Sequence, residues 1–451
     1  MDNKIVKDNS LVKETLKIAW PAIVESVFIV IVGMVDTYMV SPLGKVAIAS
    51  ISLANQPKIL IYIIFFAANV AISALIARRK GGDKRQEAHE LFMTGMVYTV
   101  VAGIILTFVC VVFAEPIIVI FGGNEETTDI TVMYFRIIMG GMLTNLIMMY
   151  INSSLRGCGN TKITLQTNVV GNIINIFCNY LLIEGHLGFP ALGVAGAGIA
   201  TVIGQTVASI MCIVAICRGK SYIQYKFIKE NKIRPTKDAG MALLKMGGNI
   251  TTEMLLTRIG FALTSMITVR IGTDPYAAHA VGMHFMNLGF AFGDGMQMAA
   301  VSLIGMSLGA KDKLKAKKIG VIAQKTGLII SVIMVAILLV FGRILYGLYF
   351  DQDYMLDMCM MINLFIAVIM PIQISKIIFN GVLRGAGDVK YTLYASAFSV
   401  TLVQPIVSYL LVMILGLGLK GVWLSILVTQ AVQFFCFALR YKSGKWTEKE
   451  I

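Results

Sequence analysis

Apolar stretches of about twenty residues recur along the whole chain, and this feature constrains the fold more than any other. A helix needs about 20 residues to cross a hydrocarbon core about 30 Å thick. Only 14% of the 451 residues are charged, against roughly 25% in a soluble domain. We therefore expect an all-α polytopic membrane protein with twelve transmembrane helices. The expected spans are Ala19–Val40, Ile48–Ile76, Met93–Phe113, Val132–Ile151, Thr164–Leu182, Val194–Ile216, Met246–Ile271, Ala277–Leu308, Ile319–Phe341, Met355–Gly381, Leu393–Leu415 and Val422–Leu439.

The formal net charge of +14 reflects topology. When the spans are numbered alternately, most lysines and arginines fall in the loops on one side of the membrane. This asymmetry is the positive-inside rule, and it predicts a multi-pass protein of the cell (inner) membrane with both termini in the cytoplasm. The basic residues do not gather on one face or in one domain, so we expect contacts with the lipid bilayer and no nucleic-acid partner.

The chain contains the same pattern twice. The segment Leu155-Arg-Gly-Cys-Gly-Asn-Thr-Lys162 returns as Leu383-Arg-Gly-Ala-Gly-Asp-Val-Lys390, and Glu25 is matched by Glu253 in nearly the same register. An even number of spans per copy predicts parallel repeats, related by a pseudo-two-fold axis along the membrane normal. We expect two six-helix lobes, 1–218 (helices 1–6) and 239–451 (helices 7–12), joined by a cytoplasmic linker, 219–238. Rocking of one lobe against the other would give alternating access.

Two acids in the first span are candidates for function, because an ionisable side chain in mid-membrane costs at least about 2.5–3.5 kcal/mol. Glu25 and Asp36 are eleven residues apart, close to a whole number of turns, so both should face the same way. Asp36 is expected near the outer third of the span. We expect no basic residue of the spans at its depth.

Asparagines occur at every turn of the fifth expected span, at positions 168, 172, 175 and 179. Asn175, Asn179 and Thr201 of the next span fall at about the depth of Asp36, which predicts a site of hard oxygens for Na⁺ or for a proton on Asp36. The alternative is that the asparagines only hydrogen-bond neighbouring helices, at about 0.6 kcal/mol each. We prefer that alternative for Asn168 and Asn172, near the cytoplasmic end.

The second copy lacks this cation site, because Thr264, Gln404 and Ser408 stand where the first has Asp36, Asn175 and Asn179. Acids and methionines elsewhere in the spans suit a cavity for apolar organic cations, since methionine re-packs readily. Ordinary buried or core roles for the same residues stay open. The candidate cavity residues are Glu25, Met34, Glu253, Met283, Met286 and Asp294.

The sequence contains no enzyme or cofactor motif in the structural context that such a motif requires. The run Gly416-Leu-Gly418-Leu-Lys-Gly421 matches GxGxxG but has no βαβ unit around it. Its counterpart near Gly193 and Gly196 predicts a tight turn into a helix with a small-residue packing face, Gly196, Ala200 and Gly204. The seven cysteines show no CxxC spacing. We expect no catalysis and no cofactor other than a coupling ion, Na⁺ or H⁺.

The sequence resembles the multidrug and toxic compound extrusion (MATE) antiporters of the bacterial NorM/DinF-like type over essentially its whole length. The resemblance rests on "KIAWPAIVES…VDTYMVSPLG", "LRGCGNTK", "NIINIFCNYLLI…LGVAGAGIATVIGQ" and "LRGAGDVK". It implies two six-helix lobes and export of amphipathic, mostly cationic drugs in exchange for Na⁺ or H⁺, with the cation ligands at Asp36, Asn175, Asn179 and Thr201. The tenth-helix aspartate of such transporters has no counterpart here, where Lys376 lies nearby.

From this resemblance we expect a monomeric, cation-coupled multidrug efflux antiporter. A lipid-linked precursor flippase of the same superfamily is an alternative, although such flippases tend to have a basic cavity and the acids dominate the first lobe here. A channel or receptor is a third possibility, but it would not need a carboxylate that alternately loads and empties.

Overall fold

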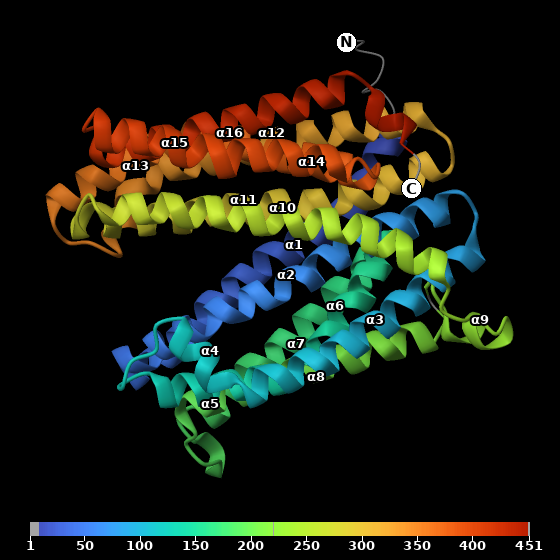
Figure 1. Ribbon diagram of the computed structural model, residues 1–451, viewed down its shortest axis with the longest axis horizontal. Coiled ribbons are helices and arrows are strands. Elements are labelled where there is room, and N and C mark those ends of the chain that lie inside the picture. The colour runs from blue at the N-terminus through green and yellow to red at the C-terminus, as the bar shows by residue number, and fades with distance from the viewer. Residues whose placement is uncertain (1–8, 220, 450–451) are drawn as a thin grey trace. The chain divides into compact units, whose positions relative to one another are not determined.

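The computed structural model describes residues 9–219 and 221–449 (Figure 1). Within these ranges the chain is helical and contains no strand. Nine of the described helices are long and apolar enough to cross a membrane. The pair α5 (Thr128–Gly140) and α6 (Met142–Gly157), bent by 47°, makes a tenth. The two chain ends, which we expect in the cytoplasm, lie outside the described residues.

All twelve expected spans coincide with helices, which confirms the all-α polytopic fold. Nine of the described helical segments are each long and apolar enough to cross a membrane without a partner. They are α1 (Asn9–Val40), α2 (Lys45–Gly81), α3 (Arg85–Val112), α8 (Gly193–Cys217), α11 (Thr273–Gly309), α12 (Lys313–Gly347), α13 (Asp353–Gly385), the run from α14 (Val389–Ser396) to Ile414, and α16 (Gly418–Lys442). The remaining expected spans are α7 (Thr161–Leu182) and α10 (Lys237–Val269), whose polar residues lower their mean hydropathy. Two short helices, α4 (Ala114–Ile120) and α9 (Tyr225–Glu230), lie between longer ones.

The helices form two compact units. Unit 1 comprises the described residues of Met1–Ile23 and Asn249–Ile451, and unit 2 comprises Val24–Gly248. The division falls inside α1 and inside α10, so each of these helices begins in one unit and ends in the other. The expected lobes, 1–218 and 239–451, instead follow the sequence repeat. In α1 the division comes just after Pro21, which removes one backbone hydrogen bond from a helix interior.

Each unit has its own apolar core. In unit 2, α6 packs against α2, α3 and α8, and α7 packs closely on α8. The larger buried side chains of that core include Tyr62, Phe65, Phe135, Met139 and Met142. In unit 1, α13 is the central helix and packs against α11, α12 and α16. Its core includes Leu303, Ile304, Ile319, Leu383 and Phe437.

The repeated Leu-Arg-Gly-x-Gly motif is a helix end of the same construction in both units. The second glycine, Gly159 or Gly387, adopts a left-handed φ of 75° or 83°. In both copies the next amide donates back to the leucine carbonyl at 2.9 Å, completing a Schellman cap. The first glycine allows close backbone contact: a Cβ on Gly157 would lie 2.5 Å from Ser73 O, and one on Gly385 would lie 2.7 Å from Val301 O. The motif therefore ends α6 and α13 against the helix that each packs on.

The second copy contains one extra residue, and a π-helical segment accommodates it. Asn168 aligns with Ser396, but Asn179 aligns with Ser408, one position later. Between these positions the chain forms a π-helix over Ala397–Val403 before α15 (Gln404–Tyr409) resumes. A π-bulge is the usual way for a helix to absorb an insertion without losing the register of its faces. The polar positions after the insertion therefore stay on the packed side, where Gln404 and Ser408 are buried.

The segment between the two copies folds onto unit 2. The Gln224 backbone amide donates to His89 Nε2 at 3.2 Å, and the Thr236 amide donates to Thr94 Oγ1 at 3.1 Å. The Arg85 guanidinium stacks on the Phe227 ring, 4.4 Å from its centroid. The start of α3 thus anchors the expected linker by backbone and cation–π contacts.

Candidate cation site

The second half of α1 and the length of α7 face each other in matching register. Glu25 contacts Asn168, and Asp36, eleven residues further on, contacts Asn179, eleven residues after Asn168. This confirms the prediction that the two acids of the first helix look the same way. The side chains that contact the two acids are Asn168 and Asn179 of α7, which lie on the same face of that helix.

Asp36 lies in a setting built mainly from uncharged oxygen and nitrogen groups. The Asn179 amide Nδ2 donates to Asp36 Oδ1 at 2.8 Å. Asp36 is half-buried, whereas Asn175 and Asn179 are buried. The carbonyl oxygen Oδ1 of Asn179 is also buried and has no hydrogen-bond partner in the described part of the chain. An oxygen that is buried without a donor costs about 1–3 kcal/mol, so it fits a site that accepts a cation or a proton.

The Asn175 amide can serve its neighbours in two orientations. In one, Nδ2 donates to Thr201 Oγ1 at 3.3 Å. In the other, Nδ2 donates to Asp36 Oδ1 at 3.0 Å, while the amide oxygen accepts from Thr201 Oγ1 at 3.3 Å. The second orientation satisfies both neighbours. In either case Asp36, Asn175, Asn179 and Thr201 form one cluster, as the sequence predicted.

Glycines bring α8 close enough for Thr201 to join this cluster. A Cβ on Gly204 would lie 2.5 Å from Gly171 O and 2.9 Å from Asn175 Cβ, and a Cβ on Gly196 would lie 2.3 Å from Leu182 O. Ala200 between them is fully buried. The small-residue face predicted for this helix is therefore confirmed, and α7 and α8 run side by side in Figure 1.

Lys58 lies close enough to Asp36 for their charges to interact, so the expectation of no base at this depth was wrong. No basic side chain forms an ion pair with Asp36 in the described residues, and Lys58 is half-buried in α2. Tyr134 of α5 also interacts electrostatically with Asp36. Lys58 follows Pro57 inside an apolar span, and the rule that singled out Asp36 applies to it equally.

Glu25 is held in a buried network and not on an open surface. It is 2% exposed, and its Oε1 accepts from Arg156 Nη1 and from Asn168 Nδ2, each at 2.7 Å. Its Oε2 accepts from Thr164 Oγ1 at 3.0 Å. The arginine of the repeated motif is therefore the partner of the first acid, which sequence spacing did not reveal. Asn168 forms a hydrogen bond between α7 and α1, which is the role that we favoured for it from the sequence.

Unit 1 repeats this network around Glu253. The Glu253 Oε2 atom lies 3.1 Å from Arg384 Nη2 and accepts from Thr392 Oγ1 at 2.9 Å. Its Oε1 accepts from Ser396 Oγ at 2.9 Å and from Asn380 Nδ2 at 3.2 Å. Each residue except Asn380 stands at the position matching one in the Glu25 network. Both glutamates thus hold the end of a motif helix to the first helix of the repeat.

The hydrogen-bond network around Glu253 extends to the positive charge of Lys376. Lys376 Nζ donates to Gln433 Oε1 at 2.6 Å, and Gln433 Nε2 donates to Ser396 Oγ at 2.9 Å. Asp294 of α11 interacts electrostatically with Lys376 and Arg384 and is itself exposed. Asp294 is therefore an accessible acid, unlike the buried Glu253.

The other expected cavity residues do not share one environment. Met34 is 51% exposed, Met283 is half-buried, and Met286 is 1% exposed in the core of unit 1. The Met286 backbone carbonyl accepts from Gln373 Nε2 of α13 at 3.3 Å. Glu25, Glu253 and Met286 are thus packing residues in this structure, whereas Met34 and Asp294 remain open to contact. No group of three or more His, Cys, Asp or Glu that could hold a metal ion occurs in the described ranges.

Known proteins of similar sequence extend over nearly the whole chain. A probable multidrug resistance protein NorM of Thermotoga maritima is 24% identical over 442 residues, covering 97% of this chain and 94% of that protein. The multidrug resistance protein NorM of Vibrio cholerae is 24% identical and covers 92% of this chain and 91% of its own. An uncharacterized transporter, YisQ, of Bacillus subtilis is 23% identical over 432 residues.

Solved structures share the fold. A MATE crystal structure in the bent conformation superposes with a TM-score of 0.87 at 21% identity, covering 98% of both chains. One in the straight conformation gives 0.88, covering 96% of this chain and 97% of the other. The sequence model of the MatE family matches this chain twice, over residues 21–181 and 250–410. The two matches together span more than half of the chain, one in each copy of the repeat, and the protein therefore belongs to the MatE family of multi-pass membrane transporters, NorM-like type.

Proposed function

We propose that this protein is a cation-coupled multidrug efflux antiporter that exports amphipathic, mostly cationic organic compounds by alternating access. The observation that carries the proposal is the Asp36 carboxylate, which is half-buried within a membrane helix and hydrogen-bonded to Asn179 at 2.8 Å, with no ion-pair partner in the described residues. The names of the NorM relatives support drugs as substrates. We place it in the cell (inner) membrane as a monomer with both termini in the cytoplasm.

The site suits an ion that binds and leaves. An isolated carboxylate inside a membrane helix is costly, by at least about 2.5–3.5 kcal/mol. Amide donors from α7 offset part of this cost, and Na⁺ or a proton would offset more. Either would also satisfy the buried Asn179 Oδ1, a hard oxygen of the kind that Na⁺ prefers and that a protonated carboxyl can donate to. A permanent salt bridge would leave no reason for such an exchange.

Unit 1 contributes different chemistry. Its matching positions lack a carboxylate: Thr264 donates to the Gly260 carbonyl at 3.0 Å within its own helix. The accessible acid there is Asp294, in a helix rich in methionine and glycine. An exposed carboxylate beside flexible apolar side chains suits an organic cation better than a small ion. We therefore assign ion coupling to unit 2 and expect Asp294 to contact the drug.

The test is transport by the full-length protein in proteoliposomes. Movement of a fluorescent organic cation is followed while a Na⁺ gradient or a pH gradient is imposed, each alone, with the membrane potential clamped. We expect one of the two gradients to drive the wild type. Asp36→Asn keeps the size of the side chain and removes its charge, so it should abolish gradient-driven transport and leave the fold intact.

A matched control is Asp274→Asn, which changes an exposed aspartate at the start of α11 that accepts from Tyr354 Oη at 3.0 Å. It should transport like the wild type. Thr201→Val, which removes one oxygen from the cluster and keeps the volume, should weaken the response to the driving ion without abolishing it. Wild-type gradient-driven transport by Asp36→Asn would refute the coupling role.

A further inference from the structure

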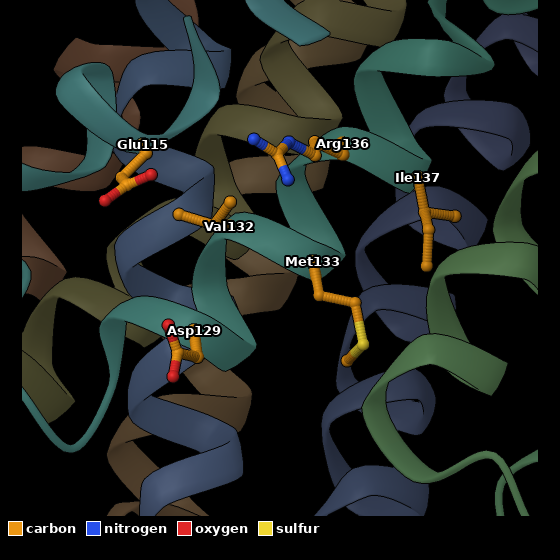
Figure 2. Close-up of a pocket in the computed structure, with 6 residues that line it drawn as sticks. All are labelled: Glu115, Asp129, Val132, Met133, Arg136 and Ile137. Carbon is orange, nitrogen blue, oxygen red and sulfur yellow. The ribbon is translucent and has the colours of Figure 1, made fainter. Parts of the chain in front are cut away.

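Unit 2 also has a charged cavity whose lining residues are not part of the cation cluster. It has a volume of about 410 Å³ and is lined by Glu115, Asp129, Val132, Met133, Arg136 and Ile137 (Figure 2). Glu115 comes from α4 and the others from α5. The volume lies within the range of about 300–1,000 Å³ typical of small-ligand pockets.

The charges around this cavity do not neutralise one another directly. Glu115, Asp129 and Arg136 are all exposed, and within the described part of the chain neither carboxylate forms an ion pair with the guanidinium. Arg136 donates through Nε to the Val111 carbonyl at 3.3 Å, which fixes its direction and leaves the terminal nitrogens available. Figure 2 shows the two acids and the arginine as separate groups around the opening, with Val132 between them. Such spacing suits a ligand that carries both signs of charge.

An apolar groove lies beside the charged cavity, because Val111 in its lining accepts from Arg136 Nε at 3.3 Å. It has a volume of about 390 Å³ and is lined by Ile104, Thr107, Phe108, Val111, Gly140 and Leu143, among others. Val111, whose carbonyl holds Arg136, belongs to it. Gly140 is four residues after Arg136 on α5, so both lie on the same face, one turn apart. The charged cavity and the groove therefore lie next to each other along α3 and α5.

The groove lies on surface that the rest of the structure leaves uncovered. Only 22% of the apolar window of α3 is buried, and Ile104 and Phe108 are 54% and 66% exposed. In a membrane-spanning helix, such apolar surface is covered by acyl chains. The groove is also open beside Gly140, at the end of α5, because a Cβ there would meet nothing within 4 Å.

The geometry points to a bound phospholipid with a zwitterionic, primary-amine headgroup of the phosphoethanolamine type. The covalent order of such a lipid is acyl chain, phosphate, ammonium, and the order along α5 toward its start is groove, Arg136, Asp129. Guanidinium binds phosphate bidentately, and a primary ammonium donates to carboxylates. An anionic lipid would bring its phosphate to Arg136 but would gain nothing from Glu115 and Asp129.

The experiment is lipid binding to the delipidated full-length protein, followed by native mass spectrometry. Phosphatidylethanolamine, phosphatidylglycerol and phosphatidylcholine with identical acyl chains are titrated separately. We expect the wild type to bind phosphatidylethanolamine at least about fivefold more tightly than the other two, since charge-assisted hydrogen bonds distinguish its ammonium. Arg136→Gln should weaken the binding of all three by about tenfold.

Three further variants separate the parts of the site. Combined Glu115→Gln and Asp129→Asn should make the affinities for phosphatidylethanolamine and phosphatidylglycerol equal. Gly140→Leu, which fills the groove without an internal clash, should weaken both and keep their ratio. Arg343→Gln, which changes an exposed arginine of α12 already paired with Asp353 at 3.0 Å, is the matched control and should bind as the wild type does.

Several outcomes would overturn the inference. These are a wild type that prefers phosphatidylglycerol, an Arg136→Gln variant that binds like Arg343→Gln, or an acid double variant that keeps the phosphatidylethanolamine preference. If Arg136→Gln does not fold, the acid pair and Gly140→Leu still decide the question. Soluble glycerophosphoethanolamine should compete only weakly, because it cannot fill the groove, and strong competition would show that the site takes a free headgroup.

Discussion

Exchanging Glu25 for glutamine removes one negative charge from a buried network and changes little in its shape. In the wild type the Glu25 side chain is 3% exposed and lies 2.7 Å from Arg156 Nη1, whose own side chain is 14% exposed. The glutamine Oε1 can still accept from both Arg156 and Asn168, as the Glu25 Oε1 does. The variant thus removes the charge that balances a nearly buried guanidinium.

The cost can be worked out from this burial. Removing one partner of a buried ion pair destabilises a protein by about 3–5 kcal/mol. Arg156 keeps its hydrogen bond to Ser153 at 3.0 Å, so we expect the lower end, about 3 kcal/mol. For domains of about 150–250 residues each kcal/mol lowers the melting temperature by about 2–4 °C. The expected decrease is therefore about 6–12 °C.

The assay is loss of the monodisperse protein on heating in detergent, measured by size-exclusion chromatography. Arg156→Gln and the double variant complete a double-mutant cycle, and the double variant should be more stable than the sum of the single effects predicts. Glu253→Gln with Arg384→Gln repeats the test in unit 1. The control is Glu14→Gln, whose partner Lys315 lies 3.1 Å away in an exposed pair worth at most about 1 kcal/mol.

Two results would refute this reasoning. One is a Glu25→Gln protein that melts with the wild type, which would show that the carboxylate is not part of the packing. The other is a folded Glu25→Gln protein whose order of preference among drugs changes, which would place Glu25 at the substrate, as the sequence suggested. Unchanged drug preference at lowered stability is the outcome that the structure predicts.

Further predictions concern the cation cluster, the repeated motif and the free thiols. Lys58→Met should lower the half-saturating concentration of the driving ion severalfold, because it removes a positive charge that opposes cation binding at Asp36; an unchanged value would show that Lys58 is electrostatically irrelevant. Gly157→Ala should lower the melting temperature by several degrees, because its Cβ would lie 2.5 Å from a backbone oxygen of α2, and wild-type stability would contradict that contact. Burial raises the pKa of the Cys158 thiol to about 12, so it stays protonated at neutral pH, and maleimide should label exposed Cys217 and leave Cys158 unmodified below about pH 10. Peptide mapping of the label checks this, and equal labelling at pH 7 would contradict the burial.

Helix positions were predictable where the apolar pattern is local. The expected span Thr164–Leu182 ends where α7 ends, and Ala19–Val40 ends with α1. The expected span Val132–Ile151 is instead two helices meeting at Gly140 and Gly141. A Cβ on Gly141 would lie 2.4 Å from Val202 of α8, so the break depends on a neighbouring helix that no local pattern describes.

The polar cluster around Asp36 was predictable because helix geometry gives depth and facing from sequence position alone. Counting residues along two neighbouring spans predicts that Asn175, Asn179 and Thr201 lie at the depth of Asp36. The apolar pattern around Lys58 hides it among span residues, although a charge within a span is itself a signal. The ion pair of Glu25 was not predictable for a different reason: its partner, Arg156, is 131 residues away.

The sequence alone determined what repeats at short range: the lengths of the spans, the two copies, the stripe of amides and the acid that faces it. These follow from the thickness of a bilayer and the pitch of a helix, which hold for any chain. The tertiary structure decided which charges meet. Glu25 and Glu253 became packing residues, and Asp36 has no ion pair within the described part of the chain. The reason is that helices far apart in sequence pack at angles and depths that only their mutual contacts set.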